Sequence, residues 1–144
     1  MLTVVDKVIF LQAVDVFSEV ATEELAVLAA IVEERRAASG AVVYRENDPS
    51  DSMYFVVSGK VRLDRDGREV TTVGANETFG TWALFDDEPR VTDATALEES
   101  RVLRIDKEEF IDVLADNVQI TQGVLKAMVR RLRALGRSVQ ARGT

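Results

Sequence analysis

The chain has 144 residues with 47% hydrophobic and 30% charged content, which is typical of one globular domain and excludes a disordered chain. It contains no cysteine and no histidine, which excludes disulfides, thiolate zinc sites and Ser-His or Cys-His catalysis, so we expect neither an enzyme nor a metal site. The net charge of −7 argues against a nucleic-acid-binding surface. The sequence has neither a long apolar run nor a signal peptide, so we expect a location in the cytoplasm or on the cytoplasmic side of a membrane protein.

The first part of the chain, residues 1–36, is predicted to be helical. Apolar residues over 4–11 indicate a short helix, and residues 14–17 follow as a turn that docks on the domain. Thr22 is expected to cap a second helix over about 22–36, because two glutamates follow it and acids stabilise the positive end of a helix.

The middle of the chain, residues 41–105, predicts a sheet of short strands. Runs of β-branched and aromatic residues recur about every ten residues, with turn signals such as Asp66-Gly67 between them. This spacing is typical of a β-barrel or sandwich. The expected strands are 41–44, 53–57, 61–65, 70–73, 92–96 and 101–105.

The last part, residues 106–136, predicts two further helices. Asp106 and Glu109 have the spacing of a capping box, which places the start of the first helix at this point. Asp116-Asn117 is expected to separate it from the final helix, and Gly136 is expected to end or fray that helix. The order helices, strands, helices predicts a mainly β fold with flanking helices, of the α+β class.

The candidate chemistry lies in the loop over residues 79–92. Gly80 lets the backbone approach a ligand closely, and a short helix beginning near Thr81 would direct free N–H groups toward an anion. The backbone amides concerned are those of Trp82, Ala83 and Leu84. Arg90 would bind two phosphate oxygens with its planar guanidinium, or would form a structural ion pair with Asp86, Asp87 or Glu88.

The run Phe-Gly-Thr-Trp-Ala-Leu-Phe-Asp-Asp-Glu-Pro-Arg over 79–90 resembles the phosphate-binding cassette of the cyclic-nucleotide-binding domain family, which includes the catabolite activator and the protein kinase A regulatory subunit. Residues 46–61 are similar to the first hairpin of that family. The resemblance implies a single domain over 1–144 built as an eight-stranded β-roll or jelly roll, with a C-terminal helical lid. It also implies a non-catalytic regulatory sensor that binds a cyclic nucleotide, cAMP more readily than cGMP. The implied ligand-binding residues are Gly80, Thr81, Trp82, Ala83, Leu84, Arg90, Val91 and Thr92.

The cassette departs from the family pattern at several positions. Thr81 stands where the family has a glutamate that accepts a hydrogen bond from the ribose, a change that could cost roughly 1.5–3 kcal/mol of binding free energy. Val91 replaces a serine or threonine, Trp82 replaces an aliphatic residue, and Asn47 replaces a glycine in a turn. These departures favour a second hypothesis, in which the cassette no longer binds nucleotide and the domain serves as a structural or protein-interaction element.

The expected partners follow from the same resemblance. The final helix either packs on the roll or forms a homodimer contact. The sequence leaves no room after that helix for the helix-turn-helix of a catabolite activator, so we expect no nucleic-acid partner. The chain is instead expected to be one domain of a longer regulated protein, such as a transporter, channel or signalling enzyme.

Overall fold

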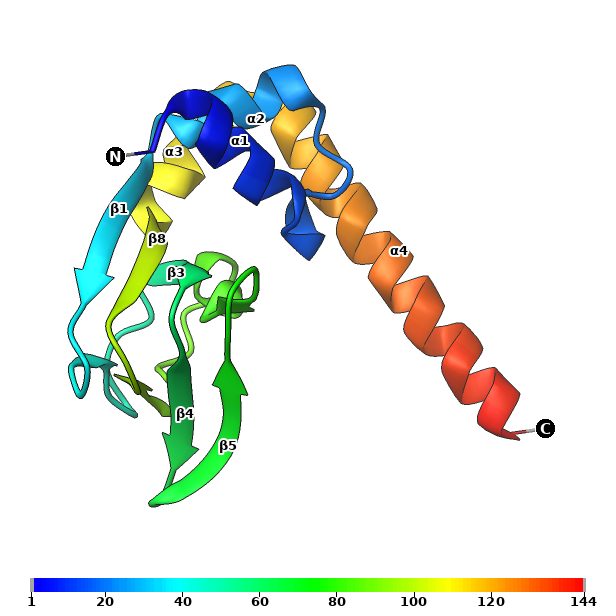
Figure 1. The fold of residues 1–144 in the computed structure, drawn as a ribbon. Coiled ribbons are helices and arrows are strands. Elements are labelled where there is room, and N and C mark those ends of the chain that lie inside the picture. The colour runs from blue at the N-terminus through cyan, green and yellow to red at the C-terminus, as the bar shows by residue number, and fades with distance from the viewer. Residues whose placement is uncertain (1, 144) are drawn as a thin grey trace.

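The computed structural model describes residues 2–143. It begins with helix α1 (Val4–Gln12), the 3-10 turn η1 (Asp15–Phe17) and helix α2 (Thr22–Ala29), which lie together on one side of the molecule (Figure 1). Thr3 caps α1 through a capping box with Asp6. The prediction that Thr22 caps the second helix was wrong, because the N-cap is Ala21 and no side chain caps this helix.

The second predicted helix was also too long. The chain leaves α2 after Ala29 and forms strand β1 (Val32–Ala37), which pairs antiparallel with β8 (Ser100–Asp106). The Glu34 carboxylate forms an ion pair with Arg101 on the neighbouring strand. Cross-strand pairing therefore determines the structure of this charged segment in place of helix propensity.

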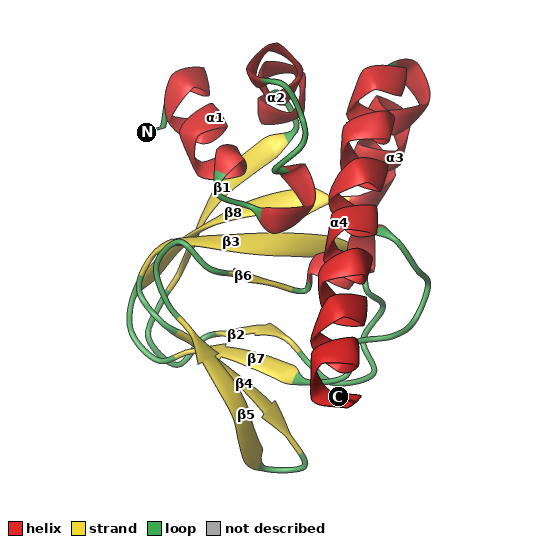
Figure 2. Ribbon diagram, turned by 90° about the vertical axis from the view of Figure 1, so that its right-hand side faces the viewer, coloured by secondary structure: helices red, strands yellow, loops and turns green. Residues whose placement is uncertain are grey.

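Eight strands form two four-stranded antiparallel sheets, with the orders β1-β8-β3-β6 and β2-β7-β4-β5. Figure 2 shows the two sheets as successive layers beneath the helices. The six predicted strands are all present, and the eight-stranded β-roll with flanking helices is confirmed. The remaining strands are β2 (Val42–Tyr44), β3 (Ser52–Ser58), β4 (Val61–Arg65), β5 (Arg68–Val73), β6 (Thr78–Phe79) and β7 (Asp93–Ala96).

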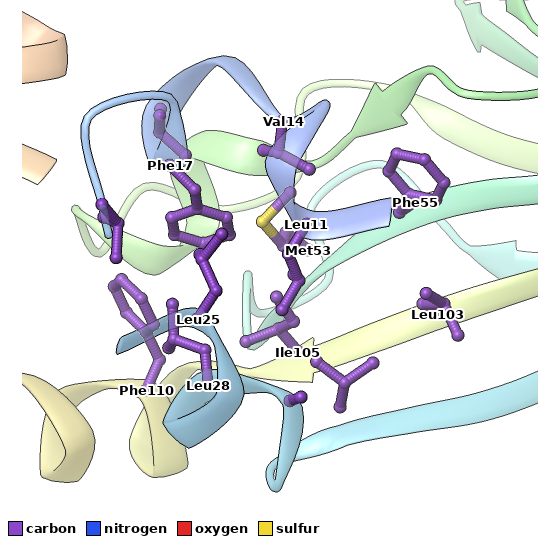
Figure 3. Close-up of a cluster of buried hydrophobic side chains, with 14 of the residues drawn as sticks. Leu11, Val14, Phe17, Leu25, Leu28, Met53, Phe55, Leu103, Ile105 and Phe110 are labelled. Carbon is purple, nitrogen blue, oxygen red and sulfur yellow. The ribbon is translucent and has the colours of Figure 1, made fainter. Parts of the chain in front are cut away.

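Strand β3 separates two hydrophobic cores. Because side chains alternate along a strand, Met53 and Phe55 point to the helices, while Tyr54 and Val56 point into the roll. Figure 3 shows Met53 and Phe55 among the side chains of the first core, which joins the helices to the sheet. Both faces of β3 are thus buried, so this strand fixes the roll against the helices.

Two helices complete the chain, α3 (Lys107–Asp116) and α4 (Val118–Gly143). The Asp106 carboxylate accepts a hydrogen bond from the Glu109 backbone N–H at 3.1 Å, which is the first half of the predicted capping box; no return bond from the Glu109 side chain is formed in this helix. Gly136 does not end the final helix, which continues to Gly143. The second half of α4 diverges from the roll (Figure 1). Within residues 2–143, no helix has the length and apolar character needed to span a membrane.

Candidate phosphate-binding site

The cassette connects β6 to β7 and begins with a left-handed glycine. Phe79 is buried at the end of β6, and Gly80 then adopts φ +71°, a conformation that residues with a Cβ rarely take. The 3-10 helix η2 (Thr81–Leu84) follows directly. The predicted short helix near Thr81 is therefore present, and the chain reaches it through the turn that Gly80 allows.

Arg90 points inward and is held by strand β3. Its side chain is only 4% exposed. Its Nη2 donates hydrogen bonds to the Ser52 carbonyl oxygen at 2.7 Å and to the Ser52 hydroxyl at 3.2 Å. The guanidinium carbon lies 4.0 Å from the centre of the Tyr44 ring, which is within the range of a cation–π contact. The guanidinium is thus fixed inside the roll.

The backbone at Arg90 is tied to the turn before β3. The Arg90 N–H donates to the Asp48 carbonyl at 2.9 Å, and the Asn47 N–H donates to the Arg90 carbonyl at 2.8 Å. Asn47 has φ +72°, which is the positive φ expected for the residue that stands in place of a glycine. These paired bonds hold the end of the cassette against the hairpin.

The alternative considered for Arg90, a structural ion pair with Asp86, Asp87 or Glu88, does not form. Asp87 pairs instead with Lys107 at 2.6 Å, and this contact lowers the pKa of the Asp87 carboxyl group. The carboxylate nearest to Arg90 is that of Asp51, at 3.6 Å. Asp51 also lies 3.7 Å from Arg104, so one exposed carboxylate is shared between two arginines.

Protein groups satisfy the Arg90 guanidinium only in part. Among the described residues, nothing accepts a hydrogen bond from its buried Nε. Nη1 faces Gly80, where an added Cβ would lie only 2.5 Å from it. A buried charged group with an unsatisfied N–H is costly, and Arg90 lines the adjacent pocket, so its guanidinium is suited to bind an anion there.

The pocket beside Arg90 has a volume of about 470 Å³. Its walls combine the cassette with strands β4 and β5, which contribute Leu63 and Val70. Thr92 is buried in it, whereas Val91 lies exposed at the rim. Burial raises the pKa of the Tyr44 phenol, which also lines the pocket, although the positive charge of Arg90 opposes this rise.

The structure brings seven of the eight predicted site residues to this pocket. They are Gly80, Thr81, Trp82, Ala83, Arg90, Val91 and Thr92. The side chain of Leu84 packs instead in the core between the helices and the sheet. The prediction of free cassette amides was wrong for Ala83, whose N–H donates to the Gly80 carbonyl at 3.1 Å.

Thr81 has a hydrogen-bond partner of its own. Its hydroxyl donates to the Thr78 hydroxyl at 3.2 Å. The lone pairs of the Thr81 oxygen therefore stay available as acceptors. The shorter side chain thus keeps an acceptor at the position of the family's glutamate, but it carries no negative charge.

Sequence reasoning missed several residues that shape this site. Ser52 and Tyr44 hold the guanidinium of Arg90, and Asp51 supplies its nearest carboxylate. Ser52 acts partly through its backbone carbonyl, which leaves no trace in a side-chain pattern. Leu63 and Val70 were assigned to strands but not to the site. The alternation of side chains along β4 and β5 was the only sequence signal that these two residues face the pocket.

The structure is thus a β-roll in which a buried, only partly hydrogen-bonded arginine lies against a glycine turn beside a pocket. The chain belongs to the cyclic nucleotide-binding domain family, since the model of that family matches residues 34–117, more than half of the chain. The resemblance seen in the cassette is therefore confirmed.

Curated relatives and solved structures agree with this assignment. The chain is 36% identical over 99 residues to the CRP-like cAMP-activated global transcriptional regulator of Mycobacterium tuberculosis. The match covers 65% of this chain and 44% of the regulator. It is 27% identical over 122 residues to the cyclic AMP receptor protein of Thermus thermophilus, covering 81% of this chain and 56% of that protein. It thus spans about half the length of these relatives.

The fold also matches the N-terminal domain of a transcriptional regulator from Streptomyces coelicolor A3(2). The TM-score is 0.80 at 32% sequence identity, and the match covers 90% of this chain and 94% of that domain.

Proposed function

We propose that the chain is a non-catalytic sensor domain that binds cAMP, and cGMP more weakly, in the pocket beside Arg90. The observation that carries this proposal is the buried Arg90 guanidinium, which lines the pocket and is fixed there by hydrogen bonds to Ser52. A phosphodiester suits this group because its two free oxygens can each accept a hydrogen bond from a planar guanidinium.

The other pocket residues supply the remaining contacts of a cyclic nucleotide. The Gly80 turn lets the phosphate approach the backbone, and the Thr81 hydroxyl accepts from the ribose. Leu63 and Val70 offer an apolar surface to the base. The preference for cAMP rests on the printed names of the relatives, one of which is described as cAMP-activated and another as a cyclic AMP receptor.

Calorimetric titration of the purified chain with cAMP and with cGMP tests this function. We expect binding of cAMP, weaker binding of cGMP, and a loss of about one to two decades in affinity for Arg90→Lys, which keeps the charge but not the planar fork. The matched control is Arg62→Lys, because Arg62 is an exposed arginine that pairs with Asp64 on β4. The absence of heat and of a thermal shift with both nucleotides at millimolar concentration would refute the proposal.

The variant Thr81→Glu separates the two hypotheses for the cassette. If the threonine only weakens ribose recognition, the glutamate restores roughly 1.5–3 kcal/mol and tightens cAMP binding by about one to two decades. If the Thr81→Glu variant still binds neither nucleotide, the cassette has lost ligand binding. The inward position of Arg90 favours the first result, since a lost site gives no reason to keep a charged group buried beside an open pocket.

The partner proposed for this sensor is a second copy of the chain, joined through α4. Exposed apolar side chains recur along this helix at intervals of three, four and seven residues, which is the pattern of a coiled-coil contact. We call this surface the α4 seam; its members are Val118, Leu125, Val129, Leu132, Leu135 and Val139.

Sedimentation equilibrium tests the dimer directly. We expect a mass of twice 15.9 kDa for the wild type and a monomer for Leu132→Asp. Ala134→Asp places the same charge on the same helix away from the α4 seam and should remain dimeric. A monomeric wild type would exclude the self-association and leave the α4 seam to a different partner.

A further inference from the structure

Trp82 separates the candidate pocket from a second, smaller space. The chain contains one tryptophan, and its side chain is 49% exposed. Trp82 lines the pocket beside Arg90 and also a crevice of about 170 Å³ between the cassette, η1 and α4. Thr81 borders both spaces as well. A displacement of the indole would therefore change the shape of the candidate pocket.

Arg131 of α4 reaches this indole from the side of the crevice. Its guanidinium carbon lies 4.9 Å from the centre of the Trp82 ring, and its Nη1 lies 3.4 Å from the Asp15 carboxylate on η1. One side chain of α4 thus contacts the cassette and the N-terminal helical layer together. The ring distance is within the range of a cation–π interaction.

Arg131 lies where α4 loses contact with the rest of the domain. Ile120, Val124 and Ala127 are buried along one face of the helix, and Arg131 follows Ala127 on that same face at the next turn. The side chains of residues 132–139 are all exposed. Apart from the neighbouring pair of Arg130 with Glu19, the contact with Trp82 and Asp15 is therefore the last tether of α4 within the part of the helix whose burial is described.

We infer that Arg131 is a positioning residue for the nucleotide pocket, because it holds the Trp82 indole in place as one of the pocket walls. The dependence on ligand rests on the function proposed above. Thermodynamic linkage is reciprocal. If the contact between Arg131 and Trp82 changes the affinity for the ligand, then binding of the ligand changes the strength of that contact between α4 and the cassette. The small number of contacts on Arg131 predicts a modest effect, about two- to fivefold in Kd.

The test uses the single tryptophan as its probe. In Arg131→Met, we expect the Trp82 emission to shift and its quenching by acrylamide to increase without ligand, and the Kd for cAMP to rise about two- to fivefold. Arg131→Lys keeps the cation and should restore most of both readouts. Arg130→Met is the matched control, since Arg130 is the adjacent arginine and pairs with Glu19 at 2.8 Å, away from the indole.

A double-mutant cycle shows whether the effect passes through the indole. In a Trp82→Leu background, the change Arg131→Met should leave the Kd for cAMP unchanged. An equal rise in Kd with and without the tryptophan would show that Arg131 acts by another route and would overturn the inference.

The remaining outcomes are also decisive. Identical emission and quenching in wild type and Arg131→Met would overturn the placement of the indole by Arg131. Changed emission with an unchanged Kd would overturn its effect on the pocket. If no variant and no wild-type sample binds cAMP, the proposed function fails together with the ligand-dependent half of this inference, while the fluorescence of the free protein still decides whether Arg131 holds Trp82.

Discussion

Gly80 and Arg90 are in such close approach that a methyl group on residue 80 would meet Nη1 of the guanidinium at 2.5 Å. The same methyl would lie 3.3 Å from the Ser52 carbonyl, which is the acceptor for Arg90. The glycine thus has two roles at once, because its φ of +71° makes the turn and its missing side chain leaves room for the guanidinium.

Gly80→Ala should therefore damage stability and binding together. We expect a loss of about 1–2 kcal/mol from the left-handed backbone and at least a tenfold weaker affinity for cAMP, measured by thermal unfolding and calorimetry. Gly40→Ala is the control, because Gly40 has φ +84° but no atom within 4 Å of an added Cβ. Equal affinity losses in the two variants would mean that backbone strain alone, and not the obstruction of Arg90, governs binding.

Asp51 is the carboxylate nearest to Arg90, so it would compete with an anionic ligand that binds as proposed. It lies 3.6 Å from Arg90 and 3.7 Å from Arg104, and its side chain is 66% exposed. Asp51→Asn should change the free energy of unfolding by less than about 0.5 kcal/mol, because exposed ion pairs contribute little. It should tighten cAMP binding by about two- to fivefold in low salt, with a smaller gain in high salt. Asp112→Asn removes the same charge from an exposed site on α3 and should change neither quantity.

Gly123 allows α4 to dock closely on the segment before α2. A Cβ at this position would lie 2.9 Å from the Glu19 carbonyl oxygen and 2.9 Å from Val20 Cγ2. Alanine improves helix propensity by about 1 kcal/mol, but overpacking costs about 1–3 kcal/mol, so Gly123→Ala should lower stability in urea unfolding. Gly136→Ala meets no atom within 4 Å and should instead raise stability by up to about 1 kcal/mol. A stabilised Gly123→Ala variant would contradict the close docking.

Glu34 should make stability depend on pH in the acid range. Hydrogen bonding from Arg101, together with the Leu2 backbone N–H, lowers the pKa of the Glu34 carboxyl group in the folded state. A lowered folded-state pKa contributes stability that is present above the unfolded value of about 4.3 and is lost as the pH falls through the folded value. We therefore expect Glu34→Gln to melt at a lower temperature than the wild type at pH 7. The difference should shrink below about pH 4, and a constant difference from pH 7 to pH 3 would refute the linkage.

The sequence was most informative where local pattern and tertiary environment agree. The strands over 53–57 and 61–65 and the cap at Asp106 all combine strong local signals with the burial that the fold gives them. The segment Val32–Ala37 shows the opposite case. Its two glutamates and two arginines favour a helix, yet the segment becomes β1 because β8 offers it a partner strand with a complementary charge at Arg101.

At the site, sequence reasoning located the buried arginine and the glycine turn but not the residues that hold them. The partners of Arg90 lie far away in the chain, and the closest hydrogen bond ends on the backbone carbonyl of Ser52. The alternative partners considered for Arg90, Asp86 to Glu88, are its neighbours in sequence, but Asp87 pairs with Lys107 at the start of α3. Contacts of this kind depend on how the two sheets pack in the folded protein, and this packing cannot be predicted from a short segment of the sequence.

The exposed stretch of α4 over residues 132–139 has a mechanical consequence for the end of the helix. From Arg131 to Gly143 the helix extends about 18 Å at 1.5 Å per residue. A tilt of the helix by about 10° at Arg131 would displace its far end by about 3 Å, because the displacement grows with the distance from the point of rotation. A small shift of the indole ring that leaves the roll unchanged would in this way become a larger displacement of the helix end.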